Sequence, residues 1–476
     1  MSAHGRVLAV DQGTSGTKAI VVDADLCVLA CVEEAVTPRT TDDGEAEHDP
    51  QALLDSVIST GRRALAEAGG RVDAVALANQ GESVLAWDRA SGAALTAVMV
   101  WHDRRAQSVV DRLAEHAAEL ETITGLPLDT YFGAPKMAWI RENLTRDGVV
   151  SSSDAWLVNR LTGACVTDAS TASRMMLTDI RRGDWSDRAL EIFGLDRAEV
   201  PEIVDNLTCV GTTDAFGQLD LPVVGLVVDQ QAALLAQHCL TPGESKCTYG
   251  TGAFLLAHTG REVITTSGLI PSVAWNTGDG DEFCLDGQVL TAGSALGWLV
   301  GAGLLPSPEA LDDVASSVAD SAGVTFVPSF AGLAAPHWRP EARASIRGLG
   351  LGHTSGHVAR AFVEGLAALV AELARRTGDA GGAPFAVLRA DGGLTRSRVL
   401  MQTQADLLQA PVEVHSSPHA TALGAAALAH AWVRGTRDLA QVVPRSAPSA
   451  LYEPAMHEAR AAEILARVTA VTGEGS

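Results

Sequence analysis

The chain has 476 residues, of which 47% are hydrophobic and 20% are charged, and its formal net charge is −23. This length predicts two or three domains, and the ordinary globular balance excludes a largely disordered protein. A chain this acidic has no general attraction for nucleic acid or for anionic membranes, so any polyphosphate ligand must be held by local loops.

Cysteine usage and apolar runs indicate a cytoplasmic protein. The seven cysteines are scattered and none forms a CxxC pair, which is typical of neither a disulfide framework nor a zinc site. We expect them to be small buried side chains in a reducing compartment. The N-terminus lacks the apolar region of a signal peptide. The longest apolar run, residues 289–305, is short for a bilayer and contains glycines, so we expect a core helix and no membrane span.

The predicted elements alternate along the chain between strands and helices. The first half predicts a hairpin of strands at 7–10 and 18–23, a helix at 51–68 behind Asp49-Pro50, strands at 72–78 and 84–87, helices at 104–120 and 135–143, a strand at 223–228 and a helix at 230–238. The second half predicts a second hairpin at 245–257, a helix at 355–376, a strand at 385–390, helices at 397–408 and 420–433, and a helical tail over 437–476. This alternation predicts the α/β class, and the repeated hairpin predicts two related lobes that meet near residues 238–244.

Three glycine-containing turns could hold phosphate groups. Asp11 ends the first strand and precedes Gly13, Thr14 and Ser15, so its carboxylate could lie near Mg²⁺ while the turn contacts phosphate oxygens. Thr251 lies in the turn of the second hairpin, and the loop 391–393 follows a strand and precedes a helix. Taken alone, the turns at Asp11 and Thr251 are more often ordinary turns, and none of the three is specific. The sequence contains neither a Walker A motif nor the protein-kinase signature set.

Asp229 terminates a very apolar strand where a helix begins. Ligand sites of open α/β sheets gather at the carboxyl ends of strands, so this carboxylate could accept a proton from a substrate hydroxyl. An ordinary helix N-cap is an equally good interpretation of an aspartate at this position.

The ordered set of motifs resembles the FGGY carbohydrate kinases, and within them the glycerol kinases most closely. The matching stretches include AVDQGTSGTKAIVVD (9–23), NQGES (79–83), VMVWHDRRA (98–106), TGLPLDTYFGAPKMAWI (124–140), VTDASTASRMML (166–177), VVDQQAALLAQHC (227–239), TYGTGAFLL (248–256) and DGGLTRSRVLMQTQADLL (391–408). The resemblance runs in family order from about residue 7 to residue 430.

The resemblance implies two actin-like (ribonuclease H-like) ATPase lobes, at 1–240 and 241–476, with ATP and Mg²⁺ in the cleft between them. It places Asp11 near the metal and Asp229 as the catalytic base. The residues that it places at ATP are Thr14, Ser15, Lys18, Thr251, Gly293, Gly297, Gly393 and Ser397. Among these, Gly297 and Ser397 stand where such kinases commonly have glutamine and asparagine.

The resemblance also implies a pocket for a small polyol. Its expected lining is Gly81, Glu82, Trp101, Tyr131, Asp229, Gln230 and Phe254. Glycerol kinases have an arginine where this chain has Gly81, and the loss of a guanidinium removes donors and opens space. We therefore expect phosphorylation of glycerol or of a longer polyol such as a tetritol, pentitol or cyclitol.

Alternatives remain open at this point. A ketose kinase acting on a pentulose belongs to the same family, and a non-catalytic actin-like nucleotide sensor would use the same cleft. Residues 211–222 contain neither arginine nor lysine, so we expect no response to a sugar bisphosphate such as fructose 1,6-bisphosphate. From related kinases we expect a homo-oligomer, either a dimer or a tetramer.

Overall fold

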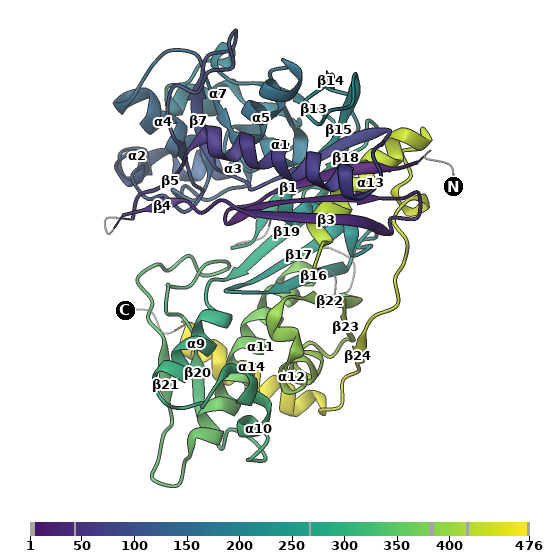
Figure 1. Cartoon of the computed structure of the whole chain (residues 1–476). Helices are drawn as coiled ribbons and strands as arrows, with labels where there is room; N and C mark the ends of the chain where they lie inside the picture. Colours follow the sequence, from purple (N-terminus) through teal and green to yellow (C-terminus); the bar gives the residue numbers. More distant parts are fainter. Residues whose placement is uncertain (1–4, 42–43, 266–267, 380–384, 416–417, 474–476) are drawn as a thin grey trace.

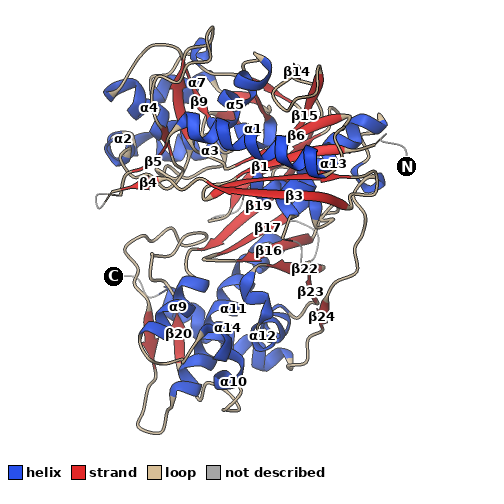
Figure 2. Ribbon diagram, in the orientation of Figure 1, coloured by secondary structure: helices blue, strands red, loops and turns tan. Residues whose placement is uncertain are grey.

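Two mixed β-sheets with helices between and outside them form the molecule. The computed structural model describes residues 5–41, 44–265, 268–379, 385–415 and 418–473. The N-terminal strands and the teal strands of the second half lie in adjacent layers, and helices of the second half cover the far side (Figures 1 and 2).

The first sheet has six strands in the order β14-β15-β6-β1-β2-β3. Their bounds are β1 Val7–Gln12, β2 Gly16–Val22, β3 Val28–Ala35, β6 Ala74–Asn79, β14 Thr212–Thr213 and β15 Leu221–Val228. β1 pairs antiparallel with β2 and parallel with β6, which in turn pairs parallel with β15. The carboxyl ends of β1, β6 and β15 therefore meet at one edge of the sheet, next to Asp11, Asn79 and Asp229.

The second sheet repeats this topology with other strands. Its order is β18-β19-β17-β16-β22-β23-β24, with β16 Glu244–Tyr249, β17 Ala253–Gly260, β18 Ile270–Asn276, β19 Asp281–Val289, β22 Val387–Asp391, β23 Val412–Val414 and β24 Ala450–Tyr452. β16 pairs antiparallel with β17 and parallel with β22, as β1 does with β2 and β6. The predicted pair of related lobes is thus present in the strand order.

The two faces of the first sheet pack against different helices. Alternation along β1 directs Leu8 and Val10 toward helix α1 (Pro50–Glu67), and Val7 and Ala9 toward the opposite face. On that opposite face α8 (Asp229–Ala236) and α13 (Ala420–Arg434) pack together. The same core continues to Leu256 and Cys284 of the second sheet, so α8 and α13 lie between the two sheets.

The remaining elements complete the two halves. A third sheet consists of β4 Arg39–Thr40, β5 Ala46–His48, β8 Val98–Met99, β7 Val84–Trp87 and β9 Val149–Ser152. Short strand pairs are β10 Val166–Asp168 with β13 Glu202–Val204, β11 Thr178–Asp179 with β12 Asp184–Trp185, and β20 Thr325–Val327 with β21 Ser345–Arg347. The other α-helices are α2 Gln107–Arg112, α3 Ala117–Thr124, α4 Gly133–Asn143, α5 Ser153–Thr162, α6 Ala169–Ala172, α7 Asp187–Phe193, α9 Gly293–Gly301, α10 Leu311–Ala315, α11 Ser355–Asp379, α12 Arg398–Leu408 and α14 Glu458–Gly473.

Most of the predicted elements are present, and three expectations need correction. The helix expected at 104–120 is divided into α2, a 3₁₀ turn at Ala114–His116 and α3. The tail is not wholly helical, because β24 adds to the second sheet by pairing with β23. Only Cys239, Cys247 and Cys284 are buried, whereas Cys27 and Cys209 are exposed, although all seven thiols are free.

The expected lobe boundary at 240/241 stays a prediction. The chain does pass from α8 into β16 at this point, but α13 from the second half packs on the first sheet beside β1 and β15 (Figure 1). Among the described residues no helix is long and apolar enough to cross a membrane.

Candidate active site

Asp229 lies where the buried strand β15 turns into α8. Val228 is the N-cap of that helix and makes no side-chain cap, so Asp229 does not serve as the N-cap. Its Oδ1 accepts a hydrogen bond of 2.7 Å from the amide of Gln230. Burial and the charge of Glu82 raise the pKa of Asp229 to about 6, against the opposing effects of that amide and of Lys246. A carboxylate with a pKa near neutrality is suited to taking a proton.

Asp11 faces the same region from the end of β1. Burial and the charge of Asp229 raise the pKa of Asp11 to about 7, while Lys18 opposes the shift. Two nearby carboxylates repel each other when both are ionised, and a bound divalent cation would relieve that repulsion. Carboxylate oxygens are also the ligands that Mg²⁺ prefers. The donor set around Asp11 and Asp229 therefore fits Mg²⁺.

Glu82 is held by an arginine from a distant part of the chain. Arg174 Nε donates to Glu82 Oε1 at 2.6 Å, and both side chains are at least 93% buried. The same guanidinium donates to Ser272 Oγ at 2.8 Å and pairs with Asp286 Oδ2 at 3.2 Å. Burial alone would lower the pKa of Arg174, but the charges of Glu82 and Asp286 raise it above its ordinary value.

The backbone at Glu82 is unusual. Its φ of +56° lies in the left-handed region, which a residue with a side chain seldom occupies. The amide of Ser83 donates to the carbonyl of Gly81 at 2.7 Å, which closes a tight turn around Glu82. The buried ion pair with Arg174 fixes the side chain that this turn presents.

Two aromatic rings adjoin this ion pair. The rings of Trp101 and Tyr131 pack edge to face, with centroids 5.5 Å apart, and the Arg174 guanidinium lies 5.8 Å from the Tyr131 ring centre. The Tyr131 hydroxyl accepts a hydrogen bond of 3.2 Å from Gln288 Nε2 of the second sheet. Residues from both halves of the chain thus meet in one polar and aromatic cluster.

Trp101 joins this cluster to the turn between β1 and β2. Its indole Nε1 donates to Thr14 Oγ1 at 3.0 Å. The buried Lys136 fixes the segment 130–132, because its ammonium donates hydrogen bonds to the carbonyls of Thr130, Tyr131 and Phe132. Burial lowers the pKa of Lys136 to about 7.

The second sheet brings Phe254 and Lys246 to the site. Phe254 pairs in register with Gln288, so it lies on the face of the sheet from which Gln288 contacts Tyr131. Lys246, which is fully buried, donates to Oε1 of Gln230 on α8 and to Thr248 Oγ1 at 3.2 Å. Lys246 therefore connects the segment that carries Asp229 to the second half of the chain.

A cavity of about 660 Å³ in the second half collects four of the expected ATP residues. Thr251, Gly293, Gly393 and Ser397 line it together with Tyr249, Gly250, Ser294, Leu296, Pro308, Glu309, Leu311, Asp312, Leu394 and Arg396. The remaining expected ATP residues are not in its lining. Ser397 uses its hydroxyl to bond the Asp312 carboxylate and to cap α12 through the amide of Leu400.

The shape of this cavity depends on close backbone approach. A Cβ on Gly293 would lie 2.6 Å from the carbonyl oxygen of Gly250. Gly392 has a φ of +94°, and a Cβ there would lie 2.4 Å from the carbonyl oxygen of Tyr249. Gly297, one turn further along α9, has open space where a Cβ would be.

Thr14, Ser15 and Lys18 lie in the first half, away from this lining. Ser15 is exposed, and Lys18 donates to the carbonyl of Pro418 and pairs with Glu33 Oε1 at 3.1 Å. Lys18 thus contacts the segment that leads into α13.

Gly81 leaves less free space than the sequence indicates. A Cβ at this residue would lie 3.0 Å from Val228 Cγ2. Part of the room left by the missing side chain is therefore filled by the residue before Asp229.

Arg174, Asp286 and Gln288 belong to the candidate site through these contacts and were not predicted from the sequence. Arg174 lies inside a motif that was used only for the family resemblance. A usable signal for the other two was the alternation along β19, where Cys284, Asp286 and Gln288 recur every second residue in a buried strand. Polar residues on a buried strand face indicate a site.

The two sheets with their helices define an actin-like two-domain fold, and the comparisons identify the family. Residues 6–236 match the N-terminal domain model of the FGGY family of carbohydrate kinases, and residues 245–432 match its C-terminal domain model. The chain belongs to the FGGY family of carbohydrate kinases.

Individual relatives agree with this assignment. The chain is 39% identical to a glycerol kinase of Leptothrix cholodnii, with 97% of each chain covered. A crystal structure of Plasmodium falciparum glycerol kinase with ADP superposes with a TM-score of 0.93 at 31% identity, covering 98% of this chain and 97% of that one. A gluconate kinase from Lactobacillus acidophilus, with a TM-score of 0.90 at 20% identity and coverage of 99% of each chain, shares the fold. The chain is therefore a phosphotransferase with an alcohol group as acceptor, and its family implies the use of ATP.

Proposed function

We propose that this enzyme transfers the γ-phosphoryl group of ATP to a hydroxyl of a small uncharged polyol, with glycerol as the first candidate. The observation that carries the proposal is the half-buried carboxylate of Asp229, with a pKa near 6, in the electrostatic field of the buried pair Glu82–Arg174. The relatives named glycerol kinases support glycerol as the acceptor.

Each residue has a distinct task in this proposal. Glu82 accepts a hydrogen bond from one substrate hydroxyl, and Trp101 covers the carbon chain with apolar surface. Asp229 takes the proton of the reacting hydroxyl as its oxygen forms a bond to the γ-phosphorus. The bond between that phosphorus and the bridging oxygen breaks, and ADP leaves.

Asp286 offers a further hydrogen-bond acceptor for the hydroxyls of the polyol. One of its oxygens pairs with Arg174, whereas its buried Oδ1 has no hydrogen-bond partner among the described residues. Buried polar atoms of folded proteins are nearly always paired, so a substrate hydroxyl is a suitable partner for this oxygen.

The proposal includes Mg²⁺, which fits the carboxylates of Asp11 and Asp229. When bound, Mg²⁺ neutralises charge on the phosphate oxygens and orients the terminal phosphate. Asp11 is the residue that would hold it, and Thr14, Ser15 and Lys18 would contact the terminal phosphates. The cavity lined by Thr251, Gly293, Gly393 and Ser397 would hold the rest of the nucleotide.

Gly81 is the basis for extending the proposal to longer polyols. Removing a guanidinium from this position takes away donors to glycerol and leaves room for a further carbon, although Val228 fills part of that room. A tetritol, pentitol or cyclitol would use what remains.

The test is ADP release from MgATP with glycerol, a tetritol, a pentitol, a cyclitol and a pentulose as separate acceptors. Acceptor-dependent turnover that disappears in Asp229→Asn is the expected result; turnover at the parental rate in that variant would refute the mechanism. Gly81→Ala narrows the pocket and should lower kcat/KM for long polyols more than for glycerol. A clear preference of the parental enzyme for glycerol would end the extension and leave the phosphotransfer proposal intact, whereas a preference for the pentulose would favour the ketose-kinase alternative.

A further inference from the structure

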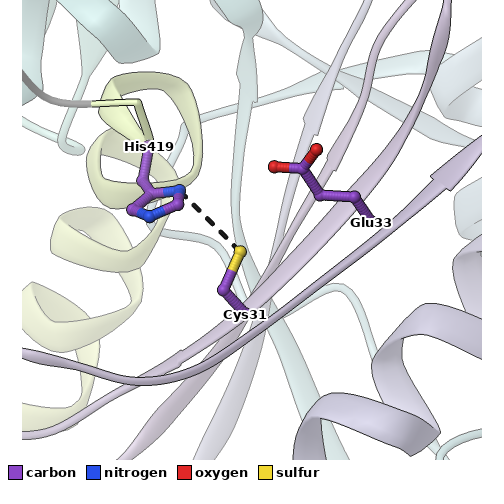
Figure 3. Close-up of side chains that lie close together, drawn as sticks. All are labelled: Cys31, Glu33 and His419. Carbon is purple, nitrogen blue, oxygen red and sulfur yellow. Dashed lines mark hydrogen bonds between the residues drawn. The ribbon is translucent and has the colours of Figure 1, made fainter.

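Two residues on one face of β3 come close to the start of α13. Cys31 and Glu33 are two positions apart on this strand and therefore point to the same side of the sheet. His419 is the residue immediately before α13 and approaches that side from the second half of the chain. Figure 3 shows the three side chains converging, with the Cys31 thiol directed at the His419 ring.

Their ligand atoms are close enough to share one ion. Cys31 Sγ lies 3.9 Å from His419 Nδ1, and one ligand atom from each of the three residues lies within 4.8 Å of the others. Tetrahedral Zn²⁺ with bonds of about 2.0–2.3 Å places its ligand atoms roughly 3.3–3.8 Å apart. Glu33 is exposed, so its side chain can rotate to close the remaining gap.

The donor types select the class of metal. A thiolate, an imidazole and a carboxylate suit a borderline-soft divalent ion such as Zn²⁺, whereas Mg²⁺ prefers oxygen ligands alone. Three protein ligands leave the fourth position of a tetrahedral ion to water. The spacing of the cysteines in the sequence could not reveal the site, because His419 lies 388 residues from Cys31 in the chain.

We propose that Cys31, Glu33 and His419 form a binding site for a divalent transition metal, with Zn²⁺ as the best-fitting ion. The site joins β3 of the first sheet to the beginning of α13, and none of its three ligands has a task in the proposed phosphotransfer.

Metal binding would replace contacts that its ligands already make, including the hydrogen-bond contact between Cys31 Sγ and His419 Nδ1. Glu33 pairs with Lys18, whose ammonium also donates to the carbonyl of Pro418 next to His419. A metal on Glu33 would take this carboxylate from Lys18. The Lys18–Glu33 pair is partly exposed, and such pairs contribute little, so this competition does not prevent binding.

Cobalt titration of the full chain tests the proposal. Co²⁺ is added in the presence of excess Mg²⁺, which occupies oxygen-only sites, and the thiolate-to-cobalt charge-transfer absorption is followed before displacement by Zn²⁺. The parental protein should give this band and bind Zn²⁺, and the affinity should fall at least tenfold in Cys31→Ser and in His419→Gln. Cys27→Ser is the matched control, because Cys27 is a free and exposed thiol four residues away.

Other results of the cobalt titration would contradict the metal site. A charge-transfer band that persists in Cys31→Ser, or one that disappears in Cys27→Ser, would overturn the site. Binding without any thiolate band would place the metal elsewhere, for example at the half-buried pair His353 and His357, and would also refute the proposal. As a second measurement, Zn²⁺ should raise the Tm of the parental protein and not that of Cys31→Ser, provided that the variant has the parental circular dichroism spectrum.

Discussion

Arg174 and Glu82 lie 92 residues apart in the chain and form a buried ion pair with a 2.6 Å contact. The pair fixes the carboxylate that we expect to hold the polyol, and Arg174 binds Asp286 of the second sheet with its other end. A single side chain thus links the turn at Glu82 to the second sheet, whose β16–β17 turn lines the proposed nucleotide cavity. It acts as a positioning residue, since it need not touch the substrate to set the geometry of Glu82.

Replacing Arg174 with glutamine should destabilise the fold and weaken polyol binding. The change leaves two buried carboxylates without their cation, a loss that typically costs about 3–5 kcal/mol. Denaturant unfolding measures the first effect, and a raised KM for the polyol with a nearly unchanged KM for ATP measures the second. Arg188→Gln is the control, because that arginine forms only exposed pairs and its loss should leave both values unchanged. Equal effects of the two variants on the polyol KM would show that Arg174 does not position Glu82.

Asp229→Asn should lower kcat by about 10²–10⁴-fold, the range typical of a lost general base. The pH profile of the parental enzyme supplies an independent check. Because the base must be deprotonated, kcat/KM should be constant above neutrality and fall as the pH drops through about 6, the pKa of Asp229. Asp11 titrates nearby with a pKa of about 7, so the observed values belong to the pair of carboxylates. A profile with no decline down to pH 5 would contradict the role of Asp229.

The family, the α/β class and most elements could be predicted from the sequence, because each of them depends on local patterns. The hairpin around residues 11–17 and the strand before Asp229 are examples, since turn residues and apolar runs define them without reference to the rest of the chain. Arg174 could not be assigned a partner, because its contacts to Glu82 and Asp286 depend on how two sheets pack. The space at Gly81 was overestimated for the same reason, since Val228 reaches it from another strand. The oligomeric state stays a prediction.

Asp11→Asn should stabilise the protein at pH 8 while abolishing metal-dependent activity. The folded-state pKa of Asp11, about 7, lies above its ordinary value of 3.8. Such a group contributes stability that is fully present below the ordinary pKa and is lost as the pH rises through about 7. An uncharged amide avoids this loss, so the Tm of the variant in EDTA should exceed the parental Tm at pH 8 by a few degrees, with a smaller difference at pH 5. Asp55→Asn, on the exposed face of α1, should show no such pH-dependent gain, and a gain of equal size there would refute the explanation.

Gly293 and Gly297 occupy successive turns of α9, and a matched pair of variants at these positions tests the proposed nucleotide cavity. Alanine at 293 would place its Cβ 2.6 Å from the carbonyl oxygen of Gly250, which must then move together with the turn around Thr251. We expect Gly293→Ala to lower the Tm and to weaken ADP binding at least tenfold in calorimetric titration. Alanine at 297 meets no atom within 4 Å and replaces a helical glycine, a change that typically stabilises a helix by about 0.5–1 kcal/mol, so its Tm should rise. If both variants bound ADP like the parental enzyme, the cavity beside Gly293 would not be the nucleotide site.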